Sequence, residues 1–154
     1  MHNDFAEHVI SQDELMQIIR LCISYVFRRS ICDVPPNSLN KTFATLRNEI
    51  RSNDYLNSIK AFFVLQDGYK EFPNDERFTT AFMTRDVYNM RSRNFILRQL
   101  ENFGNKAPIC IENYTIEHIM PQNRNLSPEW QEMFGSQLER CAKTYLHTIG
   151  NILH

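Results

Sequence analysis

The stretch Tyr114-Thr115-Ile116-Glu117-His118-Ile119-Met120-Pro121-Gln122 decides the arrangement of the C-terminal part of the chain, together with Ile149-Gly150-Asn151-Ile152-Leu153. Apolar and β-branched residues in the first stretch predict a strand, and Pro121 ends it because a proline cannot donate to a β-ladder. Glu117 and His118 lie side by side where this strand breaks, and Asn151 follows Gly150. These residues could form one site, with an imidazole that takes a proton from water beside a divalent metal held by oxygen atoms. A Glu-His pair at a strand end is also commonly structural or solvent-exposed.

The composition is that of a folded, mainly helical protein. The 154 residues suggest one domain or slightly more, and 42% apolar against 23% charged residues excludes a disordered chain. Only four glycines favour helices over turns and sheets, and eleven Phe with six Tyr predict an aromatic core. The net charge of -1 gives no support for DNA binding through overall charge, although a local basic groove is compatible with it.

The four cysteines indicate neither a zinc site nor a disulfide framework, because they lie far apart at 22, 32, 110 and 141. We see no signal peptide, so a cytoplasmic location is expected. No apolar run approaches the roughly 20 residues that a membrane span requires.

The first strong helix is predicted from Ser11 to about Ile31. Ser11 and Glu14 form the pattern of a capping box. Apolar residues at three- and four-residue steps predict its buried face, which comprises Leu15, Ile18, Ile19, Cys22, Tyr25 and Val26. Arg28 and Arg29 suit the negative end of the helix dipole, or else contact a phosphate or a partner.

Four further helices are predicted before Lys106-Ala107-Pro108. The second begins at Asn37 or Ser38, the third at Asp54, and a short fourth helix follows Phe72-Pro73-Asn74-Asp75. The last runs from about Asp86 to Phe103, with Phe95, Ile96, Leu100 and Phe103 facing inward. The predicted domains are therefore residues 1–107 and 108–154.

Two more helices are predicted between the two strands. Ser127 and Pro128 indicate the start of the first, whose buried face would contain Trp130, Met133 and Phe134. Ser136 and Glu139 form a second capping-box pattern.

The pattern T-I-E-H-I-M-P-Q followed by I-G-N-I-L resembles the HNH, or His-Me finger, nucleases. It looks most like the C-terminal nuclease domain of GmrSD-type, type IV restriction proteins, which carry T-x-E-H-x-x-P-Q, a helical insertion and G-N-L-T-L. The segments Y-V-F-R-R-S-I-C, P-x-N-S-L-N-K-x-F-A-x-L, F-P-N-D-E-R-F and L-R-Q-L-E resemble the helical part of the same family. The resemblance covers about residues 11 to 153. It implies a mainly α (α+β) fold, in which a small, incomplete ββα-metal module with a helical insertion follows a helical domain.

The resemblance also implies roles for individual residues. His118 is the general base, and Glu117 is a ligand of Mg²⁺ or Mn²⁺. Because neighbours on a regular strand point to opposite faces, both can serve one site only if the strand bends. Asn151 bonds across the hairpin, or is simply a turn residue after Gly150. The resemblance does not assign His147, which lies just before Ile149 and is either a second-shell residue or alternative metal ligand, or else a surface residue.

Four arginines, Arg85, Arg91, Arg93 and Arg98, cluster in the segment before the motif. They predict a phosphate-binding face for DNA, and the alternative is an ordinary solvated helix face.

The sequence departs from the family pattern at both ends. It stops at His154, before the helix that carries a further Asn or His ligand in the family, and the N-terminal nucleotide-hydrolysing domain is missing. We therefore expect a part of a larger protein that is inactive alone, in which a nucleotide acts only through the missing domain. The hairpin edge at Ile152, Leu153 and His154 could pair with a second copy of the chain.

The function implied by the resemblance is metal-dependent cleavage of DNA in the restriction of foreign, including modified, DNA. The alternative is a non-catalytic helical module that binds DNA or a protein and carries a degenerate nuclease finger.

Overall fold

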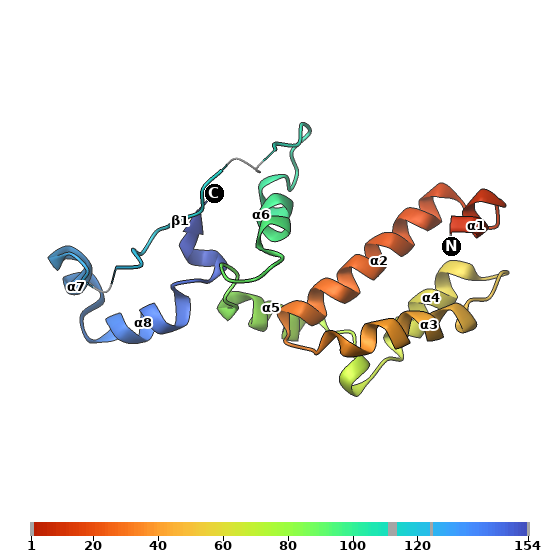
Figure 1. Ribbon diagram of the computed structural model, residues 1–154, viewed down its shortest axis with the longest axis horizontal. Helices are drawn as coiled ribbons and strands as arrows, with labels where there is room; N and C mark the ends of the chain where they lie inside the picture. Colours follow the sequence, from red (N-terminus) through yellow and green to blue (C-terminus); the bar gives the residue numbers. More distant parts are fainter. Residues whose placement is uncertain (1, 111–113, 124, 154) are drawn as a thin grey trace. The chain divides into compact units, whose positions relative to one another are not determined.

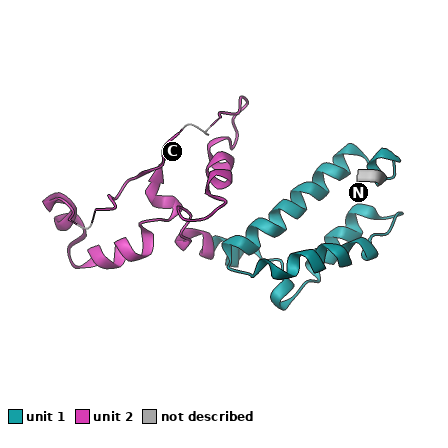
Figure 2. Ribbon diagram, viewed as in Figure 1, with its two compact units in different colours: residues 1–79 teal, residues 80–154 magenta. Residues whose placement is uncertain are grey.

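The computed structural model describes residues 2–110, 114–123 and 125–153, which are mainly helical, as predicted (Figure 1). They divide into two compact units, residues 1–79 and residues 80–154 (Figure 2). This division falls earlier than the domain boundary predicted at residues 107 and 108. Compactness alone does not decide which segment folds independently, so that boundary stays a prediction. None of the described helices combines the length and the apolarity needed to cross a bilayer.

The helices of the first unit are α1 (His2–Ala6), α2 (Gln12–Ile31), η1 (Pro36–Ser38), α3 (Leu39–Glu49), α4 (Tyr55–Val64) and η2 (Gly68–Lys70). The start of α2 confirms the predicted capping box. The backbone N–H of Glu14 donates to Ser11 Oγ at 3.2 Å, and Ser11 N–H donates to the Glu14 carboxylate at 2.9 Å. Both contacts span three residues, so the local sequence alone determines them.

The core of the first unit forms where α4 packs against α2 and α3. Ile18, Tyr25 and Phe63 are buried there, and the rings of Tyr25 and Phe63 lie 4.6 Å apart. The predicted burial of Ile19 and Val26 is wrong, because these side chains are 41% and 39% exposed. Ile18 and Tyr25 lie seven residues apart and therefore share the buried face of α2. Ile19 and Val26 each come one residue later, which turns their side chains about 100° around the helix, away from that face.

Arg29 lies inside this core, which sequence analysis did not predict. Its side chain is 1% exposed. Its guanidinium donates to two hydroxyls and three backbone carbonyls, those of Tyr25, Ser38, Pro35, Tyr69 and Glu71. Arg29 lies in the last turn of α2, where the helix dipole favours a cation, as predicted. The predicted contact with a phosphate or a partner is wrong for Arg29, because the charge is directed inward and joins α2 to the segments around η1 and η2.

Helix α5 (Asp75–Thr84) begins in the first unit and ends in the second. The other elements of the second unit are α6 (Arg93–Glu101), β1 (Glu117–His118), α7 (Pro128–Phe134), η3 (Gly135–Gln137), α8 (Leu138–Tyr145), η4 (Ile149–Asn151) and β2 (Ile152–Leu153). The two strands pair antiparallel, with Glu117 opposite Leu153 and His118 opposite Ile152. The predicted first strand is thus only two residues long, because Met120 N–H donates to the side chain of Asn151 and not to a strand. The two strands form a short antiparallel pair, and the ββα-metal module stays a prediction.

The helix predicted from Asp86 to Phe103 is shorter, since α6 begins at Arg93 and ends at Glu101. Residues 86–89 form a turn in which Asp86 accepts a hydrogen bond from Asn89 N–H at 3.0 Å. Ile96 and Leu97 are buried, whereas Leu100 and Phe103 are 49% and 89% exposed, against the prediction.

The helices between the strands begin differently from each other. α7 begins at Pro128 after Ser127, as predicted, but Met133 is exposed, against the prediction. The predicted capping box at Ser136 and Glu139 is wrong, because Ser136 lies inside η3 and Gln137 precedes α8 as its N-cap.

Candidate active site

Asn151 connects the two chain segments that carry the histidines. Its Oδ1 accepts from Met120 N–H at 2.8 Å, two residues after His118. Its Nδ2 donates to the carbonyl of Leu146 at 2.8 Å, one residue before His147. The side chain is 8% exposed, so the bond to Met120 is buried, and the bond to Leu146 is partly buried. The bond across the hairpin that the resemblance implied for Asn151 is therefore present, and a catalytic role for Asn151 stays a prediction.

The two histidines meet directly. His118 Nε2 lies 3.2 Å from His147 Nδ1, within hydrogen-bond distance. Gln122, which follows Pro121 in the motif, places its Nε2 3.1 Å from His118 Nδ1 and 3.0 Å from His118 Nε2. Both imidazoles are half-buried and Gln122 is exposed. His118 is therefore in contact with the half-buried ring of His147 and with the exposed side chain of Gln122.

Tyr88 completes a cluster of three rings. It stacks on His147 with ring centroids 5.2 Å apart at 15°, and it meets His118 at 4.7 Å and 70°. The backbone N–H groups of Val87 and Tyr88 both donate to the carbonyl of His147, at 2.9 and 3.2 Å. This turn is the segment that the sequence predicted as the first turn of a helix, and it is used here to hold His147.

The electrostatic surroundings of His118 favour a neutral imidazole. Burial lowers the pKa of His118 below its usual value, and the neighbouring His147 lowers this pKa further. The carboxylate of Glu117 acts in the opposite direction on the same pKa. The lowering contributions dominate, so His118 carries a free lone pair at neutral pH and can accept a proton.

The four predicted DNA-binding arginines do not share one helix face. Arg85 and Arg91 precede α6, and Arg93 and Arg98 lie on it. Arg91 and Arg98 are exposed, while Arg93 is half-buried over the ring of Tyr88, 5.4 Å from its centroid, and donates to the Tyr88 carbonyl at 3.0 Å. Arg93 thus places a positive charge beside the ring cluster.

The hairpin, the paired histidines and the bridging Asn151 all lie within a segment that matches a known family. The family model for the C-terminal domain of GmrSD restriction endonucleases matches residues 72–154, more than half of the chain. The chain belongs to the GmrSD restriction endonuclease family. No protein of curated function and no solved structure matches it. The GmrSD match contains the whole second unit, and the resemblance of residues 11–71 to the helical part of the family stays a prediction.

Metal binding in this GmrSD-type site would have to rely on few protein ligands. The described part of the chain contains no cluster of three or more His, Cys, Asp or Glu side chains. Glu117 is exposed and His118 half-buried, the alternation of a regular strand pair. One exposed carboxylate fits Mg²⁺, which keeps several waters and is commonly completed by substrate phosphates, but it does not fit a closed zinc site.

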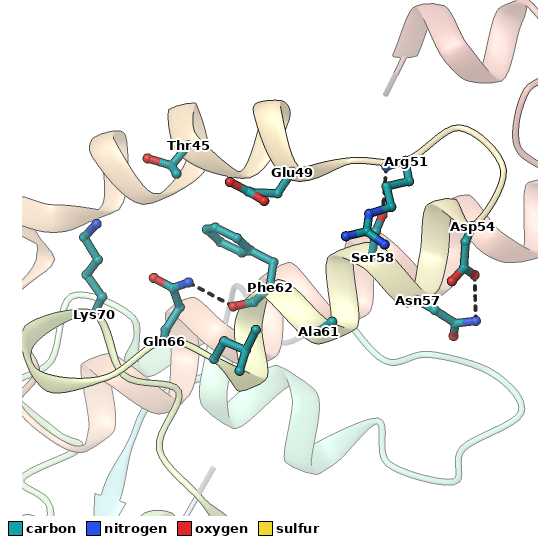
Figure 3. A pocket seen from close by; sticks show the side chains of 11 residues that line it. Thr45, Glu49, Arg51, Asp54, Asn57, Ser58, Ala61, Phe62, Gln66 and Lys70 are labelled. Carbon is teal, nitrogen blue, oxygen red and sulfur yellow. Dashed lines mark hydrogen bonds between the residues drawn. The ribbon is translucent and has the colours of Figure 1, made fainter.

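A pocket of about 540 Å³ lies elsewhere, in the first unit beside α3 and α4 (Figure 3). Arg51 and Lys70 contribute positive charges to its lining, and Glu49 and Asp54 contribute negative ones. It contains none of the residues predicted for the nuclease site. Its balanced charges favour no particular ligand.

Tyr88 is the site residue that sequence analysis missed. It lies in a stretch that was assigned to a helix, and a single aromatic residue there gave no periodic signal. Tyr88 belongs to the site because its ring stacks on His147, which is distant in sequence. Gln122 was quoted in the family motif but was given no role.

Proposed function

We propose that this chain is part of a metal-dependent DNA endonuclease of the HNH type, in which His118 is the general base. The observation that carries the proposal is the half-buried His118, held by His147 and Tyr88 and kept neutral by its surroundings. Membership of the GmrSD restriction endonuclease family supports DNA as the substrate and restriction of foreign, including modified, DNA as the purpose.

The chemistry assigned to this chain is proton transfer at a fixed imidazole. His118 accepts the proton of a water molecule as the oxygen of that water attacks the phosphorus of the scissile phosphodiester. The bond between phosphorus and the leaving sugar oxygen breaks, and that oxygen takes a proton from solvent. The exposed Glu117 carboxylate would provide a protein ligand for Mg²⁺ or Mn²⁺ beside His118 only if the strand bends when the ion binds, because in the regular strand the two side chains point to opposite faces. When bound, such an ion neutralises charge on the phosphate and on the leaving oxygen.

DNA binding is assigned to the exposed arginines before and on α6. The side chains of Arg91 and Arg98 are exposed, and the guanidinium of Arg93 lies over the ring of Tyr88, which contacts both histidines. Each arginine that contacts a phosphate should reduce the salt slope of DNA binding by roughly 1 when it is replaced. An unchanged slope for the double variant Arg91→Ala, Arg98→Ala would remove these two residues from the DNA-binding face.

The nuclease proposal is tested by plasmid cleavage with the protein that the complete gene encodes, in millimolar Mg²⁺ or Mn²⁺. His118→Ala should lower the cleavage rate by about 10²–10⁴-fold, the usual contribution of a general base. His8→Asn is a matched control, because His8 is exposed in the first unit and Asn tolerates its left-handed backbone. Equal cleavage by the two variants would exclude His118 as the base. Binding of DNA without any metal-dependent cleavage would favour a non-catalytic module.

A further inference from the structure

A group of exposed apolar side chains lies where α6 ends. Phe103 is 89% exposed, Leu100 is 49% exposed and Ile109 is 40% exposed. The backbone N–H of Phe103 donates to the carbonyl of Leu100 at 3.1 Å, and the backbone of Ile109 is bonded to Asn102. The three side chains therefore come from one short stretch of chain, which we call the Phe103 patch. Single exposed apolar residues are ordinary, whereas a group that includes an aromatic ring indicates an interaction surface.

The loop that carries Phe103 is fixed by hydrogen bonds at its base. Asn102 Oδ1 accepts from the backbone N–H of Ile109 at 2.6 Å, and Asn102 Nδ2 donates to the Ile109 carbonyl at 3.2 Å. Within the loop, Asn105 N–H donates to the Asn102 carbonyl at 3.2 Å, and Gly104 adopts the positive φ of 77° that this turn requires. The ring of Phe103 is thus presented to solvent by an ordered backbone, which lowers the entropy cost of binding.

The sequence around the Phe103 patch is basic. Residues 85–110 contain five basic residues against two acidic ones, in a chain whose net charge is -1. The basic residues are Arg85, Arg91, Arg93, Arg98 and Lys106, and the acidic ones are Asp86 and Glu101. The side chains of Arg98 and Lys106, which precede and follow Phe103, are exposed. This distribution favours a negatively charged partner.

DNA fits this combination of cations and an aromatic ring. Its phosphates attract arginine and lysine side chains, and its bases offer flat surfaces on which an aromatic ring stacks. Proteins that bend DNA insert Phe or another apolar side chain between neighbouring base pairs. A protein partner fits less well, because charged residues are depleted at the centre of protein interfaces.

We propose that Phe103 is a DNA-contacting residue, which inserts at a base step of the bound duplex while Arg98 and Lys106 contact the flanking phosphates. Such a wedge partly unstacks the step and bends the duplex. This inference rests on the proposed function, because it takes DNA as the substrate. It adds a base contact that lies outside the cluster of His118, His147 and Tyr88.

DNA affinity tests the role of the ring, with the protein that the complete gene encodes and a short duplex in EDTA, where no cleavage occurs. Phe103→Ala should weaken binding by about 5–150-fold, the contribution of one stacked base, and should reduce the bend measured between dyes at the duplex ends. The salt slope should stay unchanged because no charge is removed. The matched control is Leu65→Ala, which removes a 78% exposed apolar side chain from the first unit and should bind like wild type.

Tryptophan fluorescence tests the contact itself, because Trp130 is the only tryptophan of the 154 residues. In the double variant Trp130→Phe, Phe103→Trp, the added duplex should quench the fluorescence, whereas Trp130→Phe, Leu65→Trp should be unaffected. Equal DNA affinity of Phe103→Ala and wild type, or fluorescence at position 103 that DNA leaves unchanged, would overturn the inference and leave the nuclease proposal standing. A wild-type protein that binds no DNA would reject both.

Discussion

The two units of this chain are stabilised by different kinds of contact. In the first unit, apolar and aromatic side chains of α2, α3 and α4 form a continuous core around the buried Arg29. In the second unit, α7 and α8 bury no residue completely, and the histidine segments are joined mainly by hydrogen bonds to the backbone. The difference teaches that in the second unit, where Val87 and Ile96 are also buried, the polar contacts of Asn151 both join chain segments and position the candidate site.

The largest expected effect on stability comes from Arg29→Ala. This change leaves buried carbonyls and hydroxyls of the first unit without their donor, and each unsatisfied group costs about 1–3 kcal/mol. We expect the free energy of unfolding to fall by about 3 kcal/mol or more in urea titrations. Arg20→Ala, at an exposed position of the same helix, should stay within about 0.5 kcal/mol. Similar losses in the two variants would contradict the buried role of Arg29.

Asn151→Ala should lower the free energy of unfolding less than Arg29→Ala does, but it should disturb the positions of the two histidines more. It leaves Met120 N–H and the Leu146 carbonyl without their side-chain partner, at about 2–3 kcal/mol. NMR of the ¹⁵N-labelled chain can detect a coupling across the hydrogen bond between the imidazole nitrogens of His118 and His147, and this coupling should disappear. Asn94→Ala, at an exposed position of α6, is the matched control and should retain the coupling. Retention of the coupling in Asn151→Ala would show that the two histidines are held without this bridge.

The two units should also respond to opposite ends of the pH range. Burial and the hydrogen bond to Asp4 raise the pKa of Tyr55 in the first unit to about 12, from 10.0. The stability that neutral Tyr55 provides is therefore complete below pH 10 and is lost as pH rises toward 12. The pKa of His118 is lowered from 6.5, so the folded chain binds fewer protons than the unfolded chain, and stability falls as pH drops below 6.5.

Thermal unfolding measured across pH tests both expectations with two variants. Tyr55→Phe should flatten the loss of stability between pH 10 and 12, and His118→Gln should flatten the loss below pH 6.5. An acid loss unchanged by His118→Gln would assign the pH dependence to other groups.

Local patterns in the sequence predicted the first unit well and the candidate site only in part. The capping box at Ser11 and Glu14 was correct because its contacts span three residues. The helix predicted from Asp86 failed at its start because Val87 and Tyr88 bond to the carbonyl of His147, a partner that no local pattern contains. The buried position of Arg29 was missed for the same reason, since its acceptors belong to three separate segments.

The motif identified the region of the site but not its connections. The paired stretches around His118 and Asn151 led to the correct family, and the hairpin places them opposite each other. The contact of His118 with His147 and Tyr88 required the tertiary structure, because three segments distant in sequence meet there. The metal role of Glu117 and the DNA contacts of the arginines stay predictions. The same holds for the dimer edge at Ile152 and Leu153, of which Leu153 is exposed, and His154 lies outside the described residues.

Chemical rescue tests the central claim, that His118 is the proton-accepting group, most directly. In the protein that the complete gene encodes, His118→Ala should cleave plasmid DNA about 10²–10⁴-fold more slowly than wild type with Mg²⁺ or Mn²⁺. Imidazole added to the solution should raise that rate in proportion to its concentration, because it can supply the missing base. The rate of Asn151→Ala, which retains His118, should not rise. A His118→Ala variant that cleaves like wild type, or that imidazole leaves unchanged while wild type cleaves, would contradict the account.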